Sequence, residues 1–220
     1  MVDIKGNLKA VQEGIPEDVL LVAVTKTHTA EEMNVAIEEG VTDIGENKVQ
    51  EILDKYEKVK PVRWHMIGHL QTNKVKYIID KVCMIHSVDS LKLAKEIDKR
   101  AAQHSLTMDV LIQVNSGKEE NKFGTSAEET ETLIEEILDT CPNLKIKGLM
   151  CVAPIVEELD EVRPYFREVK AQYDKLKNIC HKNLECEVLS MGMSHDYRVA
   201  IEEGSNLVRV GSAIFGQRVY

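Results

Sequence analysis

Short runs of apolar and β-branched residues recur along the whole chain, and longer segments in which apolar residues return every three or four positions separate them. Each run is a candidate strand, and the eight runs span residues 19–25, 41–45, 62–67, 82–88, 110–115, 146–152, 187–190 and 207–211. The intervening segments place apolar residues on one helix face, as Leu91, Ala94, Ile97 and Ala101 do. A further helix is predicted before the first strand, over residues 4–13. The pattern therefore predicts alternating strands and helices.

Signals for helix ends support this division of the chain. Thr29 and Glu32 have the spacing of a capping box, in which side-chain acceptors satisfy backbone donors at a helix start. The hexapeptide Val-Ala-Ile-Glu-Glu-Gly occurs twice, at residues 35–40 and 199–204. Each copy ends on a glycine shortly before a predicted strand, where a helix can stop in the left-handed conformation.

Strands that are apolar throughout are typical of a parallel sheet whose two faces are covered by helices. Such a sheet can stay open or close. An open doubly wound sheet usually has about five to seven strands, whereas eight strand-helix units in 220 residues match a closed (β/α)8 barrel. No linker rich in Pro, Gly or Ser divides the chain. We therefore predict an α/β fold, a single TIM-type barrel domain over residues 1–220 with an extra N-terminal helix.

Composition and charge narrow the class of protein. Of the residues, 43% are hydrophobic and 30% are charged, and the formal net charge is −9, as in ordinary soluble globular proteins. The longest apolar run, residues 19–24, is too short to span a membrane, and no apolar export segment opens the chain, so we expect a cytoplasmic protein without membrane contact. Because no basic run is present, we expect no nucleic-acid partner.

Neither the cysteines nor the histidines form a metal-binding motif. The five cysteines, an odd number without a C-x-x-C pair, are expected to be reduced and mostly buried: Cys83, Cys141, Cys151, Cys180 and Cys186. His65 and His69 are four positions apart, but Gly68 and the strand-like residues around them oppose a helix. We therefore predict no metal site and expect both histidines at the rim of the barrel.

Lys26 follows the first predicted strand directly, so its side chain should reach the C-terminal rim of the barrel, where binding sites gather. Apolar surroundings lower the pKa of a lysine and leave a neutral amine that can form a Schiff base with an aldehyde. A solvated lysine that merely closes a strand is the alternative. The position alone does not decide between them.

The seventh and eighth predicted strands both lead into segments rich in glycine and hydroxyl groups, at residues 189–196 and 208–216. Backbone N–H groups in such loops can bind an anion, and barrels often bind phosphate after these two strands. One glycine would be ordinary turn chemistry, but two such loops on neighbouring strands favour a phosphate site. Asn47, after the second strand, can offer an amide to a ligand, although a helix cap is the simpler interpretation.

Six segments have the form of one known family: residues 23–27, 45–51, 64–74, 87–90, 189–194 and 208–216. Through them the chain resembles, nearly end to end, the pyridoxal phosphate homeostasis proteins, single-domain relatives of bacterial alanine racemase. The family usually has Pro where Thr29 stands, Ser where Gly117 stands and an acid where His195 stands. The first difference could alter how the loop after Lys26 is held, and the last could change the charge near the phosphate.

The resemblance implies that Lys26 carries the cofactor pyridoxal 5′-phosphate (PLP) as an aldimine. It also implies that Ser194 and the backbone of Gly211 and Ser212 hold the phosphate.

By the same resemblance, Arg209 faces the nitrogen of the pyridine ring and Asn47 lies near the other edge of the ring. A guanidinium does not give up its proton, so a nitrogen that faces Arg209 stays unprotonated and the ring withdraws electrons less strongly.

A carrier and an enzyme would share these residues. Alanine racemase has a second, β-rich domain and a partner subunit that supply a tyrosine base, whereas this chain stops at Tyr220. Two-base racemisation would then lack its second base unless Tyr220 or another chain provides one.

We therefore predict a monomeric, non-catalytic carrier or buffer of PLP, with PLP-dependent apo-enzymes as possible recipients. The alternatives are a low-activity amino-acid racemase or related PLP enzyme, and a phosphosugar-type barrel enzyme without PLP.

Overall fold

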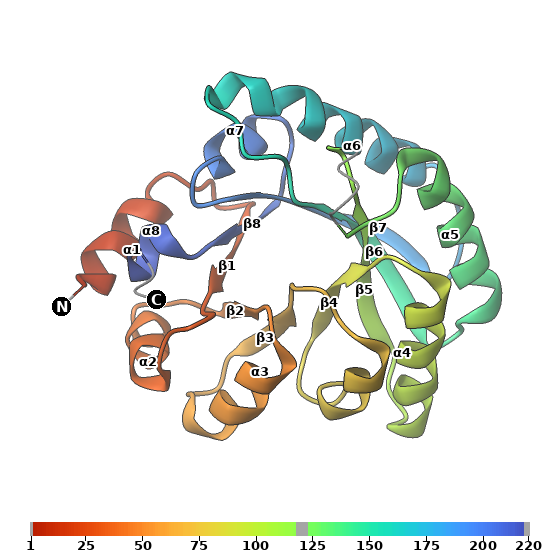
Figure 1. Cartoon of the computed structure of the whole chain (residues 1–220), viewed down its shortest axis with the longest axis horizontal. Helices are drawn as coiled ribbons and strands as arrows, with labels where there is room; N and C mark the ends of the chain where they lie inside the picture. Colours follow the sequence, from red (N-terminus) through yellow and green to blue (C-terminus); the bar gives the residue numbers. More distant parts are fainter. Residues whose placement is uncertain (1, 118–122, 218–220) are drawn as a thin grey trace.

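In the computed structural model, which describes residues 2–117 and 123–217, eight parallel strands close into a barrel (Figure 1). In chain order the strands are β1 Leu20–Val24, β2 Asp43–Glu46, β3 Arg63–Met66, β4 Met84–Val88, β5 Met108–Val114, β6 Leu144–Cys151, β7 Leu184–Met193 and β8 Leu207–Val210. Each strand pairs with the next, and β8 returns to β1 with Val208 opposite Leu21. The predicted (β/α)8 barrel is confirmed, and every predicted strand overlaps an observed one.

Helices cover the outside of the barrel (Figure 1). They are α1 Ile4–Gln12, α2 Ala30–Glu38, α3 Val49–Lys55, α4 Leu91–Gln103, α5 Ala127–Thr140, α6 Arg163–Leu176, α7 Tyr197–Glu202 and α8 Ser212–Phe215. Short 3₁₀ helices add η1 Tyr56–Lys58, η2 Thr72–Tyr77 between β3 and β4, and η3 Leu159–Val162. The predicted N-terminal helix α1 lies against α8, where the Asn7 amide donates to the Ile214 carbonyl at 3.0 Å.

The predicted helix signals are present in the structure. The Thr29 hydroxyl accepts from the Glu32 N–H while the Glu32 carboxylate accepts from the Thr29 N–H, which is the reciprocal capping box. Both copies of the repeated hexapeptide end a helix, and their glycines, Gly40 and Gly204, have φ of +97° and +95°. Residues with side chains rarely adopt this conformation, so the glycine is what allows each helix to stop there.

Apolar residues form two separate clusters. The larger one lies between the barrel and its helices and includes Ile44 and Ile85 from the strands and Phe166 from α6. The smaller one lies inside the barrel and consists of Met84, Leu111 and Met150, with Val152 and Val188 packed against them. The two clusters follow from strand geometry, because alternate residues of a strand face opposite sides of the sheet.

The barrel interior also holds a group of buried polar side chains. These polar side chains come from β2, β3, β4, β7 and β8, and they include Asp43, His65, His86, Ser190 and Arg209. His86 on β4 contacts Ser190 on β7, two strands that are not neighbours, so this contact is made across the inside of the barrel. The sequence pattern marked these strands as apolar and did not indicate the polar group within them.

Two further observations concern the whole described chain. All five cysteines are free, but only Cys141 and Cys151 are buried, while Cys186 is partly buried and Cys83 and Cys180 are exposed, so the expectation of mostly buried thiols was wrong. None of the helices formed by residues 2–117 and 123–217 has the length and apolar character needed to cross a membrane.

Candidate functional site

A cavity of about 350 Å³ opens where the strands end at the C-terminal face of the barrel. The six residues that the family resemblance singles out all line it: Lys26, Asn47, Ser194, Arg209, Gly211 and Ser212. They come from the ends of β1, β2, β7 and β8. The segment after β6, residues 152–156, and the exposed His195 complete much of the wall. The fold therefore brings together residues that lie up to 186 positions apart in the sequence.

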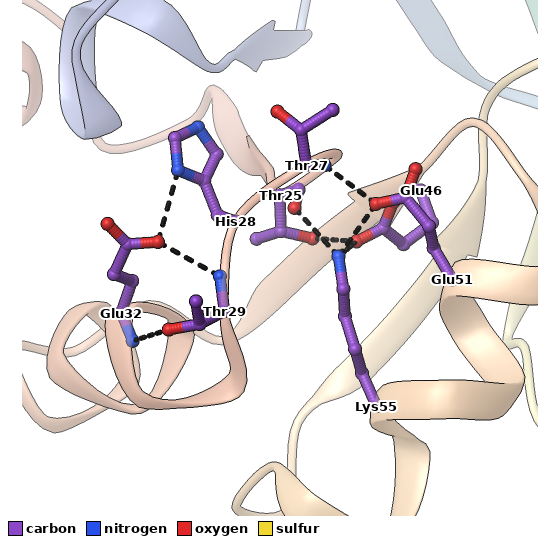
Figure 2. Close-up of polar contacts among 8 residues, drawn as sticks. All are labelled: Thr25, Thr27, His28, Thr29, Glu32, Glu46, Glu51 and Lys55. Carbon is purple, nitrogen blue, oxygen red and sulfur yellow. Dashed lines mark hydrogen bonds and ion pairs between the residues drawn. The ribbon is translucent and has the colours of Figure 1, made fainter. Parts of the chain in front are cut away.

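The residues on either side of Lys26, Thr25 and Thr27, are held in place by hydrogen bonds to β2 and α3, and Figure 2 shows those to Glu46 and Glu51. Before Lys26, the buried Thr25 donates its N–H to the Gly45 carbonyl at 3.0 Å and its hydroxyl to Glu46 Oε1 at 2.7 Å. After it, Thr27 has φ of +70°, a left-handed conformation that β-branched residues rarely adopt. The Thr27 N–H donates to the Glu51 carboxylate at 2.6 Å. These contacts fix the direction in which the Lys26 side chain leaves β1.

The ammonium group of Lys55 connects three of the residues that make these contacts, because it donates to each of them (Figure 2). Its Nζ donates to the Thr25 carbonyl at 3.1 Å, to Glu46 Oε1 at 2.9 Å and to Glu51 Oε2 at 2.8 Å. Burial raises the pKa of Glu46 despite its hydrogen bonds to Lys55 and Thr25. At Glu51 burial acts the same way, but hydrogen bonds from Lys55 and Thr27 outweigh it and lower the pKa.

Sequence reasoning missed Glu46, Glu51 and Lys55. Only the i,i+4 spacing of Glu51 and Lys55 on α3 could have indicated a pair, and that spacing does not reveal the contact with β1.

The loop after Lys26 is also attached to α8. The His28 ring stacks on the Phe215 ring with 4.8 Å between centroids and 29° between planes. His28 Nδ1 lies 3.3 Å from Glu32 Oε2, beside the capping box at Thr29 (Figure 2). Thr29, one of the departures from the family pattern, thus holds this loop through a helix cap.

The loops after β7 and β8 meet at one oxygen atom. Ser194 Oγ accepts from the Gly211 N–H at 3.0 Å and from the Ala213 N–H at 3.3 Å. A Cβ at position 211 would lie 3.1 Å from the Val24 carbonyl oxygen and 3.2 Å from Val24 Cβ. Glycine therefore lets the β8 loop approach the end of β1, next to Lys26, more closely than a residue with a side chain would.

Arg209 lies at the base of the cavity and is 3% exposed. Its Nη1 donates to the Ser190 carbonyl at 2.9 Å and to Ser190 Oγ at 2.5 Å, and its Nη2 donates to the Cys151 carbonyl at 2.8 Å. Burial lowers the pKa of Arg209, but a guanidinium starts so high that it stays charged. A fixed positive charge therefore lies at the cavity.

Asn47 presents an unusual acceptor. Its Oδ1 is buried and makes no hydrogen bond within the described part of the chain. A Cβ at position 68 would lie 2.4 Å from the Asn47 carbonyl oxygen and 2.6 Å from its Cα, so only glycine allows the loop after β3 to pack on Asn47. A buried acceptor without a donor in a cavity indicates a place where a ligand can donate.

Of the two histidines expected at the rim, one is found elsewhere. His69 is exposed and stacks on Phe123 with 3.7 Å between centroids, as a rim residue can. His65 is 2% exposed and lies in the barrel interior, so its predicted place at the rim was wrong. The period-two alternation of β3, which turns His65 away from the helices that cover Trp64, is the reason. Tyr220, named above as a conceivable second base, lies outside the described residues.

Asp43, His65 and Cys83 each bring one potential ligand atom to a group within 4.8 Å. However, both carboxylate oxygens of Asp43 are engaged, one by His65 at 2.7 Å and the other by the Arg63 guanidinium at 2.8 Å. Although part of the Cys83 residue is exposed, desolvation of its thiol and the nearby Asp43 carboxylate raise the pKa of this thiol to about 12, whereas a metal ligand must be a thiolate. We assign no metal to this hydrogen-bonded group.

Comparisons with known proteins agree on one family. The family model described as alanine racemase, N-terminal domain, matches residues 2–219. A pyridoxal phosphate homeostasis protein of Aquifex aeolicus is 49% identical over 183 residues, which are 82% of this chain and 79% of that protein. The protein of the same name from Mus musculus is 36% identical over 91% of this chain and 77% of its own length.

Solved structures of related proteins have a similar fold. PipY of Synechococcus elongatus PCC7942, a structure with PLP bound, is 29% identical with a TM-score of 0.88 and covers 97% of this chain and 100% of that one. Alanine racemase of Clostridium difficile 630, 17% identical with a TM-score of 0.78, covers 99% of this chain and 57% of that one and shares the fold.

Proposed function

Because the chain belongs to the family of pyridoxal phosphate homeostasis proteins, whose barrel is that of the alanine racemase N-terminal domain, we propose that it binds PLP at Lys26 and serves PLP homeostasis as a carrier or buffer. The observation that supports this most strongly is the shared cavity. The half-buried Lys26, the Arg209 charge and the hydroxyl and backbone groups of the β7 and β8 loops all line one space of about 350 Å³.

A second, independent observation supports PLP as the ligand of this cavity. The buried Oδ1 of Asn47 has no donor among the described residues, and Gly211 brings the β8 loop close to the end of β1. A ligand with a hydrogen-bond donor on one edge and an anionic group on the other matches these two features. PLP has a hydroxyl group on its ring and a phosphate beyond it.

When bound, PLP supplies an aldehyde that condenses with the Lys26 amine and releases water. The contacts of Thr25 and Thr27 aim the lysine into the cavity. Arg209 holds a positive charge in the cavity wall and donates no proton to a ring nitrogen.

The phosphate is held by the Ser194 hydroxyl group and the Ser212 N–H, whereas the Gly211 N–H, expected from the family resemblance to hold it too, already donates to Ser194 Oγ. Because Ser194 Oγ accepts from the backbone N–H groups of Gly211 and Ala213, its own hydroxyl hydrogen remains to be donated to a phosphate oxygen. The Ser212 N–H lies at the start of α8, between the two residues whose N–H groups donate to Ser194 Oγ. Hydrogen bonds to a charged group are worth about 1.5 to 3 kcal/mol each, so these contacts supply a large share of the affinity.

One observation favours a second candidate function. The His195 imidazole lines the same cavity as Lys26 and could move a proton to or from a bound amino acid. A low-activity racemase is therefore the alternative. We prefer the carrier because the relatives are named for PLP homeostasis.

Three finer points belong to the same proposal. In this proposal, residues 1–220 form one domain and a single chain is the working unit. Free thiols, including the exposed Cys83 and Cys180, support a reducing compartment such as the cytoplasm. PLP-dependent apo-enzymes are the proposed recipients.

The first test maps the covalent site. Borohydride reduction of the PLP-loaded protein, followed by peptide mass analysis, should place a pyridoxyl group on Lys26. Lys26→Ala should bind no cofactor covalently, while Lys48→Ala, a nearby control, should bind normally. A label mainly on Lys48 or Lys74 would contradict the assignment.

The second test separates affinity from chemistry. Pyridoxal lacks the phosphate and should bind more weakly than PLP by about 100-fold or more, since two hydrogen bonds to a charged group are lost. Ser212→Asp should likewise prevent PLP retention by setting a carboxylate against the phosphate. Equal binding of pyridoxal and PLP, followed by the absorbance of the lysine-bound cofactor, would show that the phosphate site is misassigned.

The third test decides between carrier and enzyme. With saturating PLP and a panel of amino acids, we expect turnover far below the usual enzyme range of about 1 per second or more. Turnover in that range that disappears in His195→Ala would establish the racemase.

A further inference from the structure

The buried polar side chains inside the barrel form one continuous series of hydrogen bonds. Arg209 Nη1 lies 2.5 Å from Ser190 Oγ, and Ser190 Oγ lies 3.4 Å from His86 Nδ1. His86 Nε2 lies 2.9 Å from His65 Nδ1, and His65 Nε2 lies 2.7 Å from Asp43 Oδ1. We call these five residues, Arg209, Ser190, His86, His65 and Asp43, the interior chain. None of them is more than 3% exposed.

The interior chain connects the two ends of the barrel. Arg209 lines the cavity at the C-terminal face. Asp43 is the first residue of β2, at the N-terminal end of the strand, and its other oxygen, Oδ2, accepts from Arg63 Nη2 at 2.8 Å and from Thr42 Oγ1 at 2.7 Å. The Arg63 side chain is 60% exposed, so the chain ends next to solvent on the face opposite the candidate site.

The two ends fix the direction of every hydrogen bond. A guanidinium can only donate, and an ionised carboxylate can only accept. If Ser190 accepts from Arg209 and donates to His86 Nδ1, then His86 carries its proton on Nε2 and donates to His65 Nδ1. His65 then also carries its proton on Nε2 and donates to Asp43. Within the chain, every member between the ends then accepts one bond and donates one, and the His65 Nε2–H also lies near Cys83 Sγ, at 3.4 Å.

A charged His65 would break this order. It would donate to His86 from Nδ1, and His86 would have to donate to Ser190, whose buried hydroxyl hydrogen would then lack an acceptor within the described part of the chain. Burial, His65 and Arg209 hold the pKa of His86 well below its ordinary value. Burial raises the pKa of Asp43, but hydrogen bonds from His65, Arg63 and Thr42 outweigh it and keep the carboxylate ionised.

We propose that the interior chain is a positioning device for Arg209, in which all donors point from Arg209 toward Asp43, so that the carboxylate at one end of the barrel sets the hydrogen bonding of the guanidinium at the other. Hydrogen bonds in such a series polarise one another in a low-dielectric interior. The role of this guanidinium toward PLP rests on the proposed function, whereas the direction of the chain does not.

The direction can be tested on the cofactor-free protein. Two-bond 1H–15N correlation spectra distinguish the two neutral tautomers of histidine from each other and from imidazolium. At pH 7.5 we expect both His65 and His86 as the neutral Nε2–H tautomer. A charged His65, or an Nδ1–H tautomer at either residue, would overturn the proposal.

Asp43→Asn makes the sharper test, because it should reverse the chain. Arg63 and Thr42 both donate to Oδ2, so the amide oxygen of asparagine should take that place and its NH2 group should face His65. His65 Nε2 must then accept, and both imidazoles should change to the Nδ1–H tautomer. Arg63→Met, which leaves the carboxylate in place, should keep the Nε2–H tautomers. Unchanged tautomers in a folded Asp43→Asn variant would overturn the proposal.

The link to the candidate site is tested with PLP added. In Asp43→Asn we expect a displaced absorbance maximum of the lysine-bound cofactor, with less than about a tenfold change in PLP affinity, because Asp43 does not contact the cavity. Ser190→Ala interrupts the chain but keeps the backbone contacts of Arg209, so Asp43→Asn should cause no displacement in that background.

Equal spectra of wild type and Asp43→Asn, or a displacement that survives Ser190→Ala, would refute the link. If the wild type failed to bind PLP, the proposed function would fail, while the tautomers of the cofactor-free protein would still decide the direction of the chain.

Discussion

The layer between the barrel and its helices and the interior of the barrel are stabilised by different contacts. In the outer layer, apolar side chains such as Ile44, Ile85 and Phe166 pack against many neighbours. In the interior, a small apolar cluster around Met84 shares the space with the interior chain, where His86 has one partner on each ring nitrogen.

This difference separates what stabilises the fold from what determines the chemistry. An apolar contact is non-directional and can be replaced by another of similar volume. A buried hydrogen bond has one geometry, and its loss leaves a polar group unsatisfied. We therefore expect substitutions in the outer layer to lower stability alone, and substitutions in the polar regions to change stability and cofactor behaviour together.

The largest effect should come from the outer layer. Phe166 is fully buried on α6, and Phe166→Ala should lower the free energy of unfolding by about 3 to 5 kcal/mol, measured by urea denaturation with circular dichroism. PLP affinity at a temperature where the variant is folded should not change. A parallel loss of affinity would break the separation between the two regions.

Lys55→Met should lower the free energy of unfolding by about 3 kcal/mol, because it leaves the fully buried Glu46 side chain without its cation. PLP affinity should fall as well, because Lys55 holds the backbone before Lys26. The double variant Lys55→Met with Glu46→Gln should regain part of the stability, since no buried charge remains. Normal affinity in a destabilised Lys55→Met would show that this network serves the fold only.

The buried His86 in the barrel interior should make the free energy of unfolding depend on pH. His86 stays neutral when folded but takes up a proton in the unfolded chain below about pH 6.5, so the unfolded state binds more protons and stability falls as the pH decreases. Protonation of His86 in the unfolded chain should lower the free energy of unfolding by about 1.4 kcal/mol for each pH unit below pH 6.5, and it should have no effect well above that pH.

Urea denaturation between pH 7.5 and pH 5.5 measures this slope, and His86→Leu should show a correspondingly smaller one. Asp43 does not interfere, because its pKa lies below its ordinary value of 3.8 and it stays ionised throughout this range. Equal slopes in the two proteins would mean that His86 is charged in the folded state.

The smallest effect concerns the left-handed Thr27. Thr27→Gly should relieve backbone strain and raise the free energy of unfolding by at most about 1 kcal/mol, because the unfolded chain also gains freedom. PLP affinity should decrease slightly, since the segment after Lys26 becomes less restricted. Thermal unfolding with and without PLP measures both effects, and a destabilised Thr27→Gly would argue against strain at this position.

Sequence reasoning predicted the outer layer well and the interior poorly, for the same physical reason. Apolar periodicity along one segment is enough to define a helix, as the spacing of Leu91, Ala94 and Ile97 shows, and a short apolar run is enough to define a strand. The partners of His65 and His86 come from other strands, and nothing in a single segment identifies them.

Lys26, Asn47 and the loops after the last two strands were singled out by their places at strand ends, and the family resemblance added the expected role of each residue. Lys55, which acts through a contact with β1, has no signal of its own.

The close approach of Gly68 to the backbone of Asn47 has a consequence for reading other sequences. The glycine makes no side-chain contact with any ligand, yet an added methyl group would collide with the main chain at 2.4 Å. The two positions are therefore coupled through shape and not through side-chain identity. A homologue that replaces Asn47 with another residue should still carry glycine at position 68 if it keeps the same loop path. Such a glycine would mark the preserved architecture of the site even where the ligand has diverged.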